Sequence, residues 1–248
     1  MIIRKGQRYP DYVMDSNDHE PLVKKLKLTD ERPAILRNFI RVELSPLNSL
    51  TSTKPADWDV YIDESGDLPA WFEDKRADWE YKCTKIMTEK IVPSWIKDGI
   101  NGSLNLQDTE IRTLGSLKSV GGYLNLRGTQ VRTLGSLRSV NGSLDLWGTQ
   151  VKTLGSLRSV GCFLYLQGTQ IRTLGSLESI GGSLDLQNTQ VKTLGSLKNV
   201  GGYLYLRGTQ VRTLGSLRSV GGYLDLRGTQ IGTLPKNLKA GGAIYKDF

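Results

Sequence analysis

A cluster of carboxylates in the first third of the chain is the group of side chains best suited to hold a metal ion. Asp57, Asp59, Asp63, Glu64 and Asp67 lie within one short stretch, and carboxylate oxygens are the usual ligands of Ca²⁺ and Mg²⁺. Neither Asp57 nor Asp63, taken as the first ligand, puts a glycine and a final glutamate where an EF-hand calcium loop needs them. We therefore expect a solvated turn here and no metal site.

Part of this cluster also carries a resemblance. The segment Tyr61-Ile62-Asp63-Glu64-Ser65-Gly66-Asp67 is similar to the opening strand of a family of RNase H-like proteins. The resemblance implies metal-dependent nuclease chemistry in the N-terminal part of the chain, which we keep as a remote alternative. Only seven residues carry it, and the chain between them and the repeats described below is too short to build that fold.

Nucleophiles and general bases are sparse. The single histidine, His19, lies between Asp18 and Glu20 in a polar stretch and is expected at the surface. Cys83 falls on the apolar stripe of an expected helix and Cys162 falls in a turn, with no histidine partner for either. We expect no catalytic residue, no cofactor and no small-molecule substrate, so the chain is not predicted to be an enzyme.

Repetition is the dominant feature of the rest of the chain. The block Leu-x-Leu-x-x-Thr-x-Ile/Val-x-Thr-Leu-Gly-Ser-Leu-x-x-Val-Gly-Gly occurs seven times, and a partial eighth copy ends the chain. The copies begin at Leu104, Leu124, Leu144, Leu164, Leu184, Leu204 and Leu224. A block of this length cannot bury its own apolar side chains, so the copies must stack on one another. In the first copy the residues that start the six apolar ladders are Leu104, Leu106, Ile111, Leu114, Leu117 and Val120.

This pattern resembles the leucine-rich repeat family in its short bacterial form. The resemblance implies a β-rich solenoid with one parallel sheet of about eight short strands, concave on its open side, and a small helical or mixed domain capping its N-terminal end. The chain departs from the family because a threonine, beginning with Thr109, replaces the asparagine ladder in every copy. A buried hydroxyl can satisfy backbone groups between coils as that asparagine does. The substitution also leaves a right-handed β-helix open as an alternative.

Glycine-rich positions predict the turns. The position that begins with Asn101 holds only Gly or Asn, and the position that begins with Asp108 holds only Gly, Asn or Asp. Both sets tolerate a positive φ, which we expect at both turns. The next position, which begins with Gly102, holds glycine in every copy except for Cys162. A residue with a side chain is therefore tolerated, and we expect limited space at this position and no positive φ.

Composition limits the surroundings of the protein. Hydrophobic residues make up 38% of the 248 residues, and no stretch approaches the roughly 18 apolar residues of a membrane helix. Residues 1–13 lack the hydrophobic core of a signal peptide. We therefore expect a cytoplasmic protein with no membrane contact, in the host cytoplasm if it is phage-encoded or an effector. The two cysteines are far apart and are expected to be free thiols.

The net charge of +8 is concentrated in the repeats. Residues 1–100 carry 16 Lys and Arg against 18 Asp and Glu, whereas residues 101–248 carry 17 against 7. Much of this charge falls in two columns, one of which is Arg112, Arg132, Lys152, Arg172, Lys192 and Arg212. The other is Lys118, Arg138, Arg158, Lys198 and Arg218, interrupted by Glu178. These columns are interpreted as a solvated face that keeps the protein dispersed, as a site for nucleic acid or another polyanion, or as a field that attracts an acidic protein.

The expected strand of each copy also points three side chains away from the core, because side chains alternate along a strand. These outward positions vary most between copies and collect aromatic residues and arginines, the types enriched in interface hot spots. Cross-strand packing that only stabilises the sheet is the alternative. The residues predicted to bind a partner are Tyr123, Arg127, Asp145, Trp147, Phe163, Tyr165, Asp185, Tyr203, Tyr205, Arg207, Tyr223, Asp225 and Arg227.

The N-terminal hundred residues are expected to form the cap. One helix is predicted to begin at Thr29 or Asp30, with an apolar stripe formed by Ile35, Leu36, Phe39, Ile40 and Leu44. A second is predicted over 75–91, with Trp79, Cys83, Ile86, Met87 and Ile91 on one side, ended by Pro93. Trp95 and Ile96 are then expected to cover the first coil.

These expectations define the predicted domains and function. Residues 1–74 form a mixed or partly irregular domain, residues 75–100 a helical cap, and residues 101–248 the solenoid, whose last segment, about 232–248, is a C-terminal cap. Short solenoids of this type resemble those of bacterial effectors and of bacterial or phage proteins. The resemblance implies a non-catalytic adaptor or inhibitor that docks a macromolecule, most readily a protein, on its open sheet.

Overall fold

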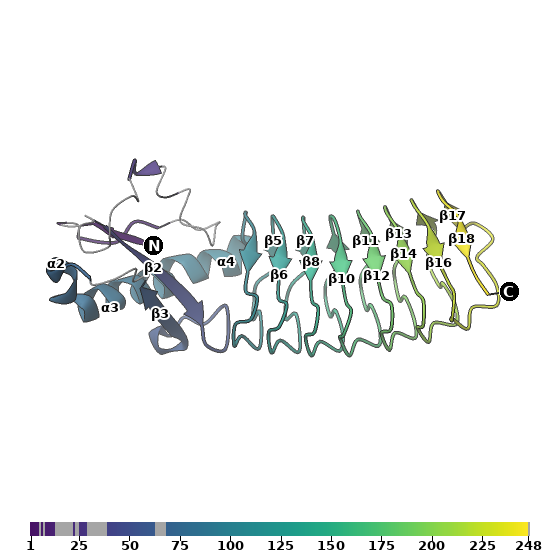
Figure 1. Ribbon diagram of the computed structural model, residues 1–248, viewed down its shortest axis with the longest axis horizontal. Helices are drawn as coiled ribbons and strands as arrows, with labels where there is room; N and C mark the ends of the chain where they lie inside the picture. Colours follow the sequence, from purple (N-terminus) through teal and green to yellow (C-terminus); the bar gives the residue numbers. More distant parts are fainter. Residues whose placement is uncertain are drawn as a thin grey trace.

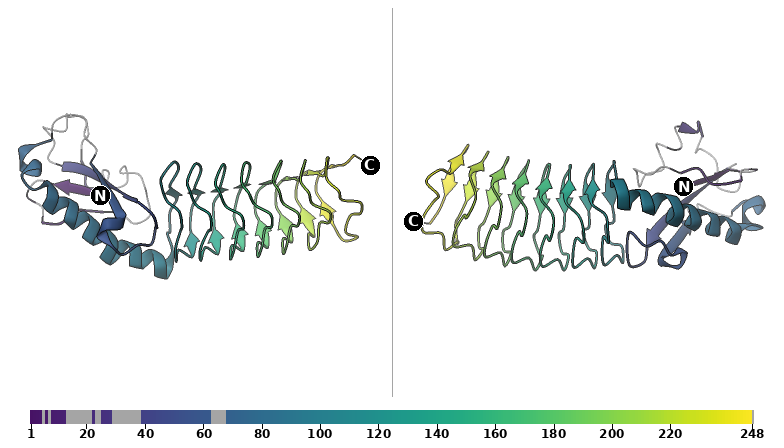
Figure 2. Two further views of the ribbon diagram at one scale, coloured as in Figure 1. Left: turned by 90° about the horizontal axis from the view of Figure 1, so that it is seen from below. Right: turned by 180° about the vertical axis from the view of Figure 1, so that it is seen from behind.

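The computed structural model describes residues 1–4, 6, 8–12, 22, 25–28, 39–62 and 68–247. A small N-terminal unit lies at one end, and a row of stacked coils extends from it to the C-terminus (Figure 1). The coils are repeated with little change along the row, as the side views show (Figure 2). The protein is therefore a repeat solenoid with a spacing of about 20 residues and a non-repeating region at its start.

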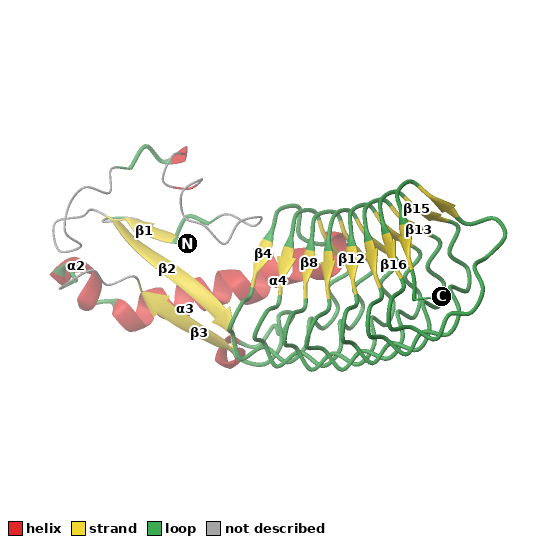
Figure 3. Cartoon of the chain, turned by 45° about the vertical axis from the view of Figure 1, so that its right-hand side comes forward, coloured by secondary structure: helices red, strands yellow, loops and turns green. Residues whose placement is uncertain are grey.

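Two parallel sheets run along the solenoid (Figure 3). The larger has eight strands: β4 (Leu104–Asn105), β6 (Leu124–Asn125), β8 (Leu144–Asp145), β10 (Leu164–Tyr165), β12 (Leu184–Asp185), β14 (Leu204–Tyr205), β16 (Leu224–Asp225) and β18 (Ile244–Tyr245). The smaller has seven: β5 (Ser119–Val120), β7 (Ser139–Val140), β9 (Ser159–Val160), β11 (Ser179–Ile180), β13 (Asn199–Val200), β15 (Ser219–Val220) and β17 (Lys239–Ala240). Neighbouring strands pair in register, for example Leu104 with Leu124 and Ser119 with Ser139.

The second sheet goes beyond the single sheet that the sequence predicted. A third line of contact runs along the threonine that precedes the Leu-Gly-Ser-Leu turn, where Thr113 bridges Thr133 and Thr173 bridges Thr193 in parallel. Where these bridges form, a coil meets the next along three lines, so that backbone groups on several sides of the coil pair with the neighbouring coil. This is a β-solenoid.

The six predicted apolar ladders form one continuous core. In the middle coils their side chains are 0–1% exposed, as for Leu144, Leu146, Val151 and Leu154. Full burial of one such side chain contributes roughly 1.5–3 kcal/mol. Because each coil buries six of them against its neighbours, stacking supplies the stability that a single coil lacks.

The threonine that replaces the asparagine ladder is buried but bonds within its own coil. The Thr149 hydroxyl donates to the carbonyl of Leu146 at 2.8 Å, and the Thr149 N–H donates to the same carbonyl at 3.1 Å. The same hydroxyl bond occurs in all seven copies. The prediction that these hydroxyls satisfy backbone groups between coils is therefore wrong, because the three-residue turn within the coil takes the bond.

The glycine positions behave differently from one another. The Asp108 position has positive φ as predicted, with +57° at Asp108 and +71° at Gly128. The Asn101 position does not, and the prediction there is wrong. A Cβ added at Gly121 would lie 1.9 Å from the Asn101 carbonyl oxygen, so close stacking of coils favours glycine there, although Asn141 occupies the same position one coil further on. The position after it is also tight, as predicted: a Cβ at Gly142 would lie 2.7 Å from the backbone of Gly122.

The N-terminal unit combines an antiparallel sheet with helices. The sheet order is β1 (Ile2–Arg4), β2 (Phe39–Pro46), β3 (Trp58–Ile62), with the short η2 (Pro55–Asp57) before β3. Phe39, Ile40 and Leu44 therefore lie in a strand, and the predicted helix is wrong from residue 39 onward. Its earlier part, residues 29–38, lies outside the described residues. Pairing of β2 with both β1 and β3 fixes the extended backbone.

The second predicted helix is confirmed. It consists of α3 (Arg76–Ile86) and the π-helical η3 (Met87–Ile91), preceded by the short α2 (Ala70–Glu73). Trp79, Cys83, Ile86, Met87 and Ile91 are all buried, as expected. Pro93 does not end it, because η3 continues without a break into α4 (Val92–Asp98), which contains the proline near its start.

The end of α4 and a loop of the N-terminal unit cover the first coil. Trp95 and Ile100 belong to the same buried cluster as the solenoid core, and the Trp95 ring lies 6.4 Å from that of Trp58. Ile100 bridges Val120 and thereby extends the line of the smaller sheet, and Ser49 bridges Thr113 and thereby extends the line of threonines. Both lines of pairing thus continue into the N-terminal unit. The apolar ladders are thereby closed at this end.

The last coil ends the array differently. Leu234 and Ile244 are only half-buried, and Lys246 is exposed at a position where the other coils hold a buried leucine. Pro235 replaces the glycine of the Leu-Gly-Ser-Leu turn. No helix among the described residues is long and apolar enough to cross a membrane.

Candidate functional site

The outer side of the larger sheet gathers most of the exposed large apolar side chains. We call it the aromatic face and define it by the three outward positions of each coil, beginning at Ser103, Asn105 and Gln107. Seven of the eleven exposed large hydrophobic residues among the described residues lie on it: Tyr123, Trp147, Phe163, Tyr165, Tyr203, Tyr223 and Tyr245. Tyr205 is half-buried. The predicted partner-binding residues are thus brought onto one side of the solenoid.

The aromatic rings pack against one another. The ring centroids of Tyr203 and Tyr223 are 5.2 Å apart with planes 15° from parallel, and those of Phe163 and Tyr165 are 6.0 Å apart at 25°. The Tyr203 ring also lies over Gly222, where an added Cβ would approach its Cδ1 atom to 2.5 Å. Ring faces are therefore partly covered inside the protein, and exposed ring edges and phenol hydroxyls remain for a partner.

Arginines extend this packing. The Arg127 guanidinium lies 4.5 Å from the centroid of the Trp147 ring, and that of Arg227 lies 5.4 Å from that of Tyr245. A cation over an exposed aromatic ring contributes about 0.5–1 kcal/mol. These contacts hold two of the longest side chains of the face in place, which lowers the entropy lost when a partner binds.

The aspartates of the face have a structural role in their own coils. Asp145 Oδ1 accepts the Trp147 N–H at 2.8 Å, and Asp185 Oδ1 accepts the Gln187 N–H at 2.9 Å. Asn105 and Asn125 make the same bond two residues along the chain. In the coils with Asp or Asn at this position, the contact satisfies the N–H that follows the two-residue strand, a bond that the tyrosines at the same position cannot supply.

Asp225 is the most buried acid of the face, at 5% exposure. Its carboxylate accepts two bonds from the Arg227 guanidinium, at 2.9 and 2.6 Å. These side-chain bonds are the main reason that the pKa of Asp225 is lowered and that of Arg227 raised. Burial, together with Tyr203 and the carboxylates of Asp185 and Asp225, raises the pKa of the half-buried Tyr205.

Alternate coils contribute different residues to the aromatic face. In the first outward position, serine alternates with an aromatic residue over the first six coils: Ser103, Tyr123, Ser143, Phe163, Ser183, Tyr203. Each serine hydroxyl accepts the N–H of the aromatic residue one coil further on. In the second position aspartate alternates with tyrosine from Asp145 to Tyr245. From Ser143 to Tyr205 the first two outward positions thus repeat every two coils, about 9.6 Å if adjacent strands are about 4.8 Å apart, whereas the third outward position does not alternate.

The cationic columns lie elsewhere on the coil. The first column, which we call the cationic row, consists of Arg112, Arg132, Lys152, Arg172, Lys192 and Arg212, and all six are exposed. Arg132 Nε donates to Gln150 Oε1 at 3.1 Å, and Arg212 Nε donates to Gln230 Oε1 at 2.9 Å. In the second column, Lys198 pairs with Glu178 at 2.8 Å, which accounts for the lowered pKa of that glutamate.

The residues considered for catalysis are not brought together. Cys83 is buried, which raises the pKa of its thiol to about 12, and Cys162 is exposed in a turn. Asp57 accepts a short bond from the Ser52 hydroxyl, and Asp59 bonds the N–H of Val60. His19, Asp63, Glu64 and Asp67 lie outside the described residues. In the described part of the chain no group of three or more His, Cys, Asp and Glu side chains could hold a metal ion.

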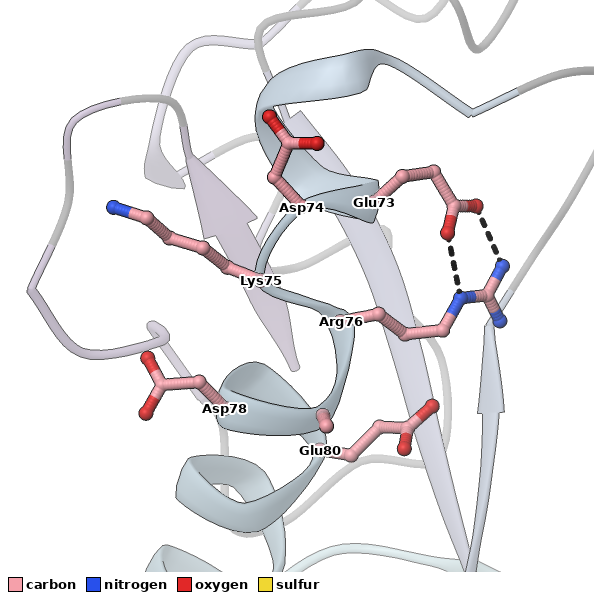
Figure 4. A pocket seen from close by; sticks show the side chains of 7 residues that line it. Glu73, Asp74, Lys75, Arg76, Asp78 and Glu80 are labelled. Atoms are coloured by element: carbon pink, nitrogen blue, oxygen red, sulfur yellow. Dashed lines mark hydrogen bonds and ion pairs between the residues drawn. The ribbon is translucent and has the colours of Figure 1, made fainter.

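A shallow depression at the start of α3 is lined almost wholly by charged residues (Figure 4). Arg76 makes two bonds to the Glu73 carboxylate, at 3.0 and 2.8 Å, and Lys82 pairs with Asp78. Ligand sites are usually lined mainly by apolar side chains. The depression has no such lining.

Tyr245 is the aromatic residue of the face that the sequence prediction omitted. It contacts Tyr223, at 5.9 Å between ring centroids, as well as Arg227. The partial eighth copy aligns Tyr245 with Tyr205, so the repeat register itself was the signal. Comparison with protein families, characterised proteins and solved structures finds no match for this chain.

Proposed function

We propose that the protein is a non-catalytic binding protein that docks a protein partner on its aromatic face. The concentration of exposed Tyr, Trp and Phe side chains on one sheet, with arginines between them, carries the proposal. Aromatic residues and arginine are enriched at interfaces, and Trp, Tyr and Arg dominate hot spots. An adaptor or an inhibitor would use such a face without chemistry of its own.

The ring packing supports a protein partner over a polysaccharide. Sugars stack on open ring faces, whereas Tyr203 and Tyr223 cover a face of each other and Arg127 lies over Trp147. Ring edges, phenol hydroxyls and guanidinium groups suit the mixed polar and apolar contacts of a protein interface. Because many of these side chains already hold one another, little rotamer entropy is lost on docking.

The finer family assignment is also a proposal. The Leu-x-Leu-x-x-Thr-x-Ile pattern and the parallel strand at Leu104–Asn105 support a leucine-rich-repeat-like coil. The second parallel sheet and the threonine line support the β-helix alternative. On either geometry the outward positions of the larger sheet form the variable surface.

The test is a pair of matched variants in a binding assay. A photo-crosslinking residue at position 147 captures a partner from native host lysate, and the captured protein is then purified. Trp147→Ala with Tyr165→Ala should weaken its binding by about 2 kcal/mol or more, roughly 30-fold. The control is Arg138→Ala with Ser159→Ala, which lies on the other side of the coil. Equal affinities for the two double variants would show that the aromatic face does not dock the partner.

The two-coil repeat provides a sharper version of the same test. Deleting residues 161–200 removes two coils and brings Ser143 and Asp145 next to Tyr203 and Tyr205, so the alternation is kept. Deleting residues 161–180 removes one coil and places Asp145 next to Asp185. If the partner contacts residues from several coils in this alternating order, the shorter deletion should lower the binding affinity more than the longer one. Isothermal titration calorimetry would measure both affinities.

A further inference from the structure

Most cations of the two cationic columns have no carboxylate partner among the described residues of the solenoid. No carboxylate among the described residues lies within ion-pairing distance of any of the six members of the cationic row, whereas Lys198 in the second column pairs with Glu178. The column beside the row begins with Glu110, next to Arg112, and then holds neutral glutamines at positions 130 to 230. Two of these glutamines fix Arg132 and Arg212 by accepting from Nε.

The row and the second cationic column border one strip of the solenoid. Between them each of the first six coils exposes only a threonine, a glycine and a serine, as at Thr133, Gly135 and Ser136. The Thr133 hydroxyl oxygen accepts the Gly135 N–H at 3.3 Å, which leaves the hydroxyl hydrogen to be donated outward. A strip of hydroxyl donors between two lines of cations is suited to phosphate oxygens.

We propose that this strip binds the phosphate backbone of double-stranded nucleic acid without reading its sequence. Six cations at a spacing of about 4.8 Å form a straight line about 24 Å long, which can follow a duplex that carries one charge per about 1.7 Å of its axis. The strip carries no aromatic side chain between the two columns in any coil. Single-strand binding uses such rings to stack bases, so the duplex is the form that the surface favours.

The same composition argues against a membrane surface. Peripheral membrane binding combines cations with apolar side chains that enter the headgroup region, and the strip exposes threonine, glycine and serine instead. The proposal does not depend on the aromatic face, because the two surfaces use different positions of the coil.

Fluorescence anisotropy with a labelled duplex of about 20 base pairs tests the proposal. Four phosphate contacts would give a slope of about −3.6 in log affinity against log salt, equivalent to a fall of roughly 150-fold between 0.05 and 0.2 M. The duplex should bind more tightly than either of its strands. Arg132→Glu with Lys152→Glu and Arg172→Glu should abolish binding, and the corresponding Gln triple variant should reduce the slope by about three.

The matched control reverses three exposed cations of the N-terminal helices, Lys85→Glu, Lys90→Glu and Lys97→Glu, which changes the net charge by the same amount. This variant should keep most of the affinity. The proposal is overturned if the wild type does not bind the duplex at 0.15 M salt or if the control loses as much affinity as the row variant. It is also overturned if single strands, heparin or anionic vesicles are bound more tightly than the duplex.

Discussion

The N-terminal unit and the solenoid bury apolar side chains in different ways. In the N-terminal unit, Ile3, Ile62, Phe72, Trp79 and Cys83 form a cluster in which each contact occurs once. In the solenoid, the same six ladder positions meet in every coil, so each contact is made again one coil further on. Loss of an element from the unit removes contacts that nothing replaces, whereas loss of a coil brings equivalent surfaces together.

Deletions of similar length should therefore have opposite outcomes in the two regions. Removing residues 75–98 takes away the cover of Leu104 and Leu106, and we expect self-association through the bare end of the stack. Removing residues 161–180 lets β8 pair with β12 in register, and a shorter monomer that melts cooperatively is expected. Light scattering and thermal melting measure both. A monomeric 75–98 deletion together with an unfolded 161–180 deletion would contradict the contrast.

Truncation of a single core side chain should affect a larger part of the N-terminal unit than of the solenoid. Phe72→Ala and Leu166→Ala remove fully buried side chains and should each lower the free energy of unfolding by about 3 kcal/mol or more. Hydrogen exchange should increase throughout the N-terminal unit for Phe72→Ala. For Leu166→Ala the increase should decline over neighbouring coils. Ser156→Ala, at an exposed position, is the control, and an equally wide effect from both truncations would show that the chain unfolds as one unit.

The smallest expected effect is a difference in pH dependence. The Cys83 thiol has a pKa of about 12 when folded and 9.0 when unfolded. Its stabilising contribution is complete below 9.0 and falls as the pH rises, by about 1 kcal/mol at pH 10. The pKa of Asp225 is lowered on folding, so its contribution is present above the unfolded value of 3.8 and falls in acid. That part is under about 1 kcal/mol, because Arg227 is half exposed.

Two variants test whether Cys83 and Asp225 cause this pH dependence of the free energy of unfolding. Cys83→Ala should flatten the alkaline side of the unfolding free energy against pH, and Asp225→Asn should flatten the acid side. Chemical denaturation at a series of pH values provides the measurement. If either variant leaves both slopes unchanged, the titration of another group is responsible.

The repeating part of the fold was predictable because each inference was supported by several copies. The inward ladders, the stacked coils and the positive φ at Asp108 all follow from which residues vary and which do not. The Asn101 position shows the limit of that reasoning. Gly and Asn together suggested positive φ, but the structure shows instead a close approach of the preceding coil, whose backbone would lie 1.9 Å from a Cβ added at Gly121. Contacts between coils cannot be deduced from one coil's residue types.

The N-terminal unit offered only one copy of each signal. Ile40 and Leu44 fit a helical stripe, yet the alternation of buried Ile40 and Val42 fits a strand equally well, and short apolar runs do not distinguish the two. Pairing with segments distant in sequence decided between them. On the aromatic face, sequence predicted which residues point outward. The hydrogen bond that Asp145 accepts from the Trp147 N–H and the position of the Tyr203 ring over Gly222 could not be predicted from the sequence.

The two-coil repeat of the aromatic face has a consequence for inheritance. Because every coil presents the same ladders, the gain or loss of whole blocks would leave the core intact. A change by one block would shift serine and aromatic positions relative to each other beyond the junction. A change by two would lengthen or shorten the surface and leave its order unchanged. Selection acting on the surface would therefore retain the even steps.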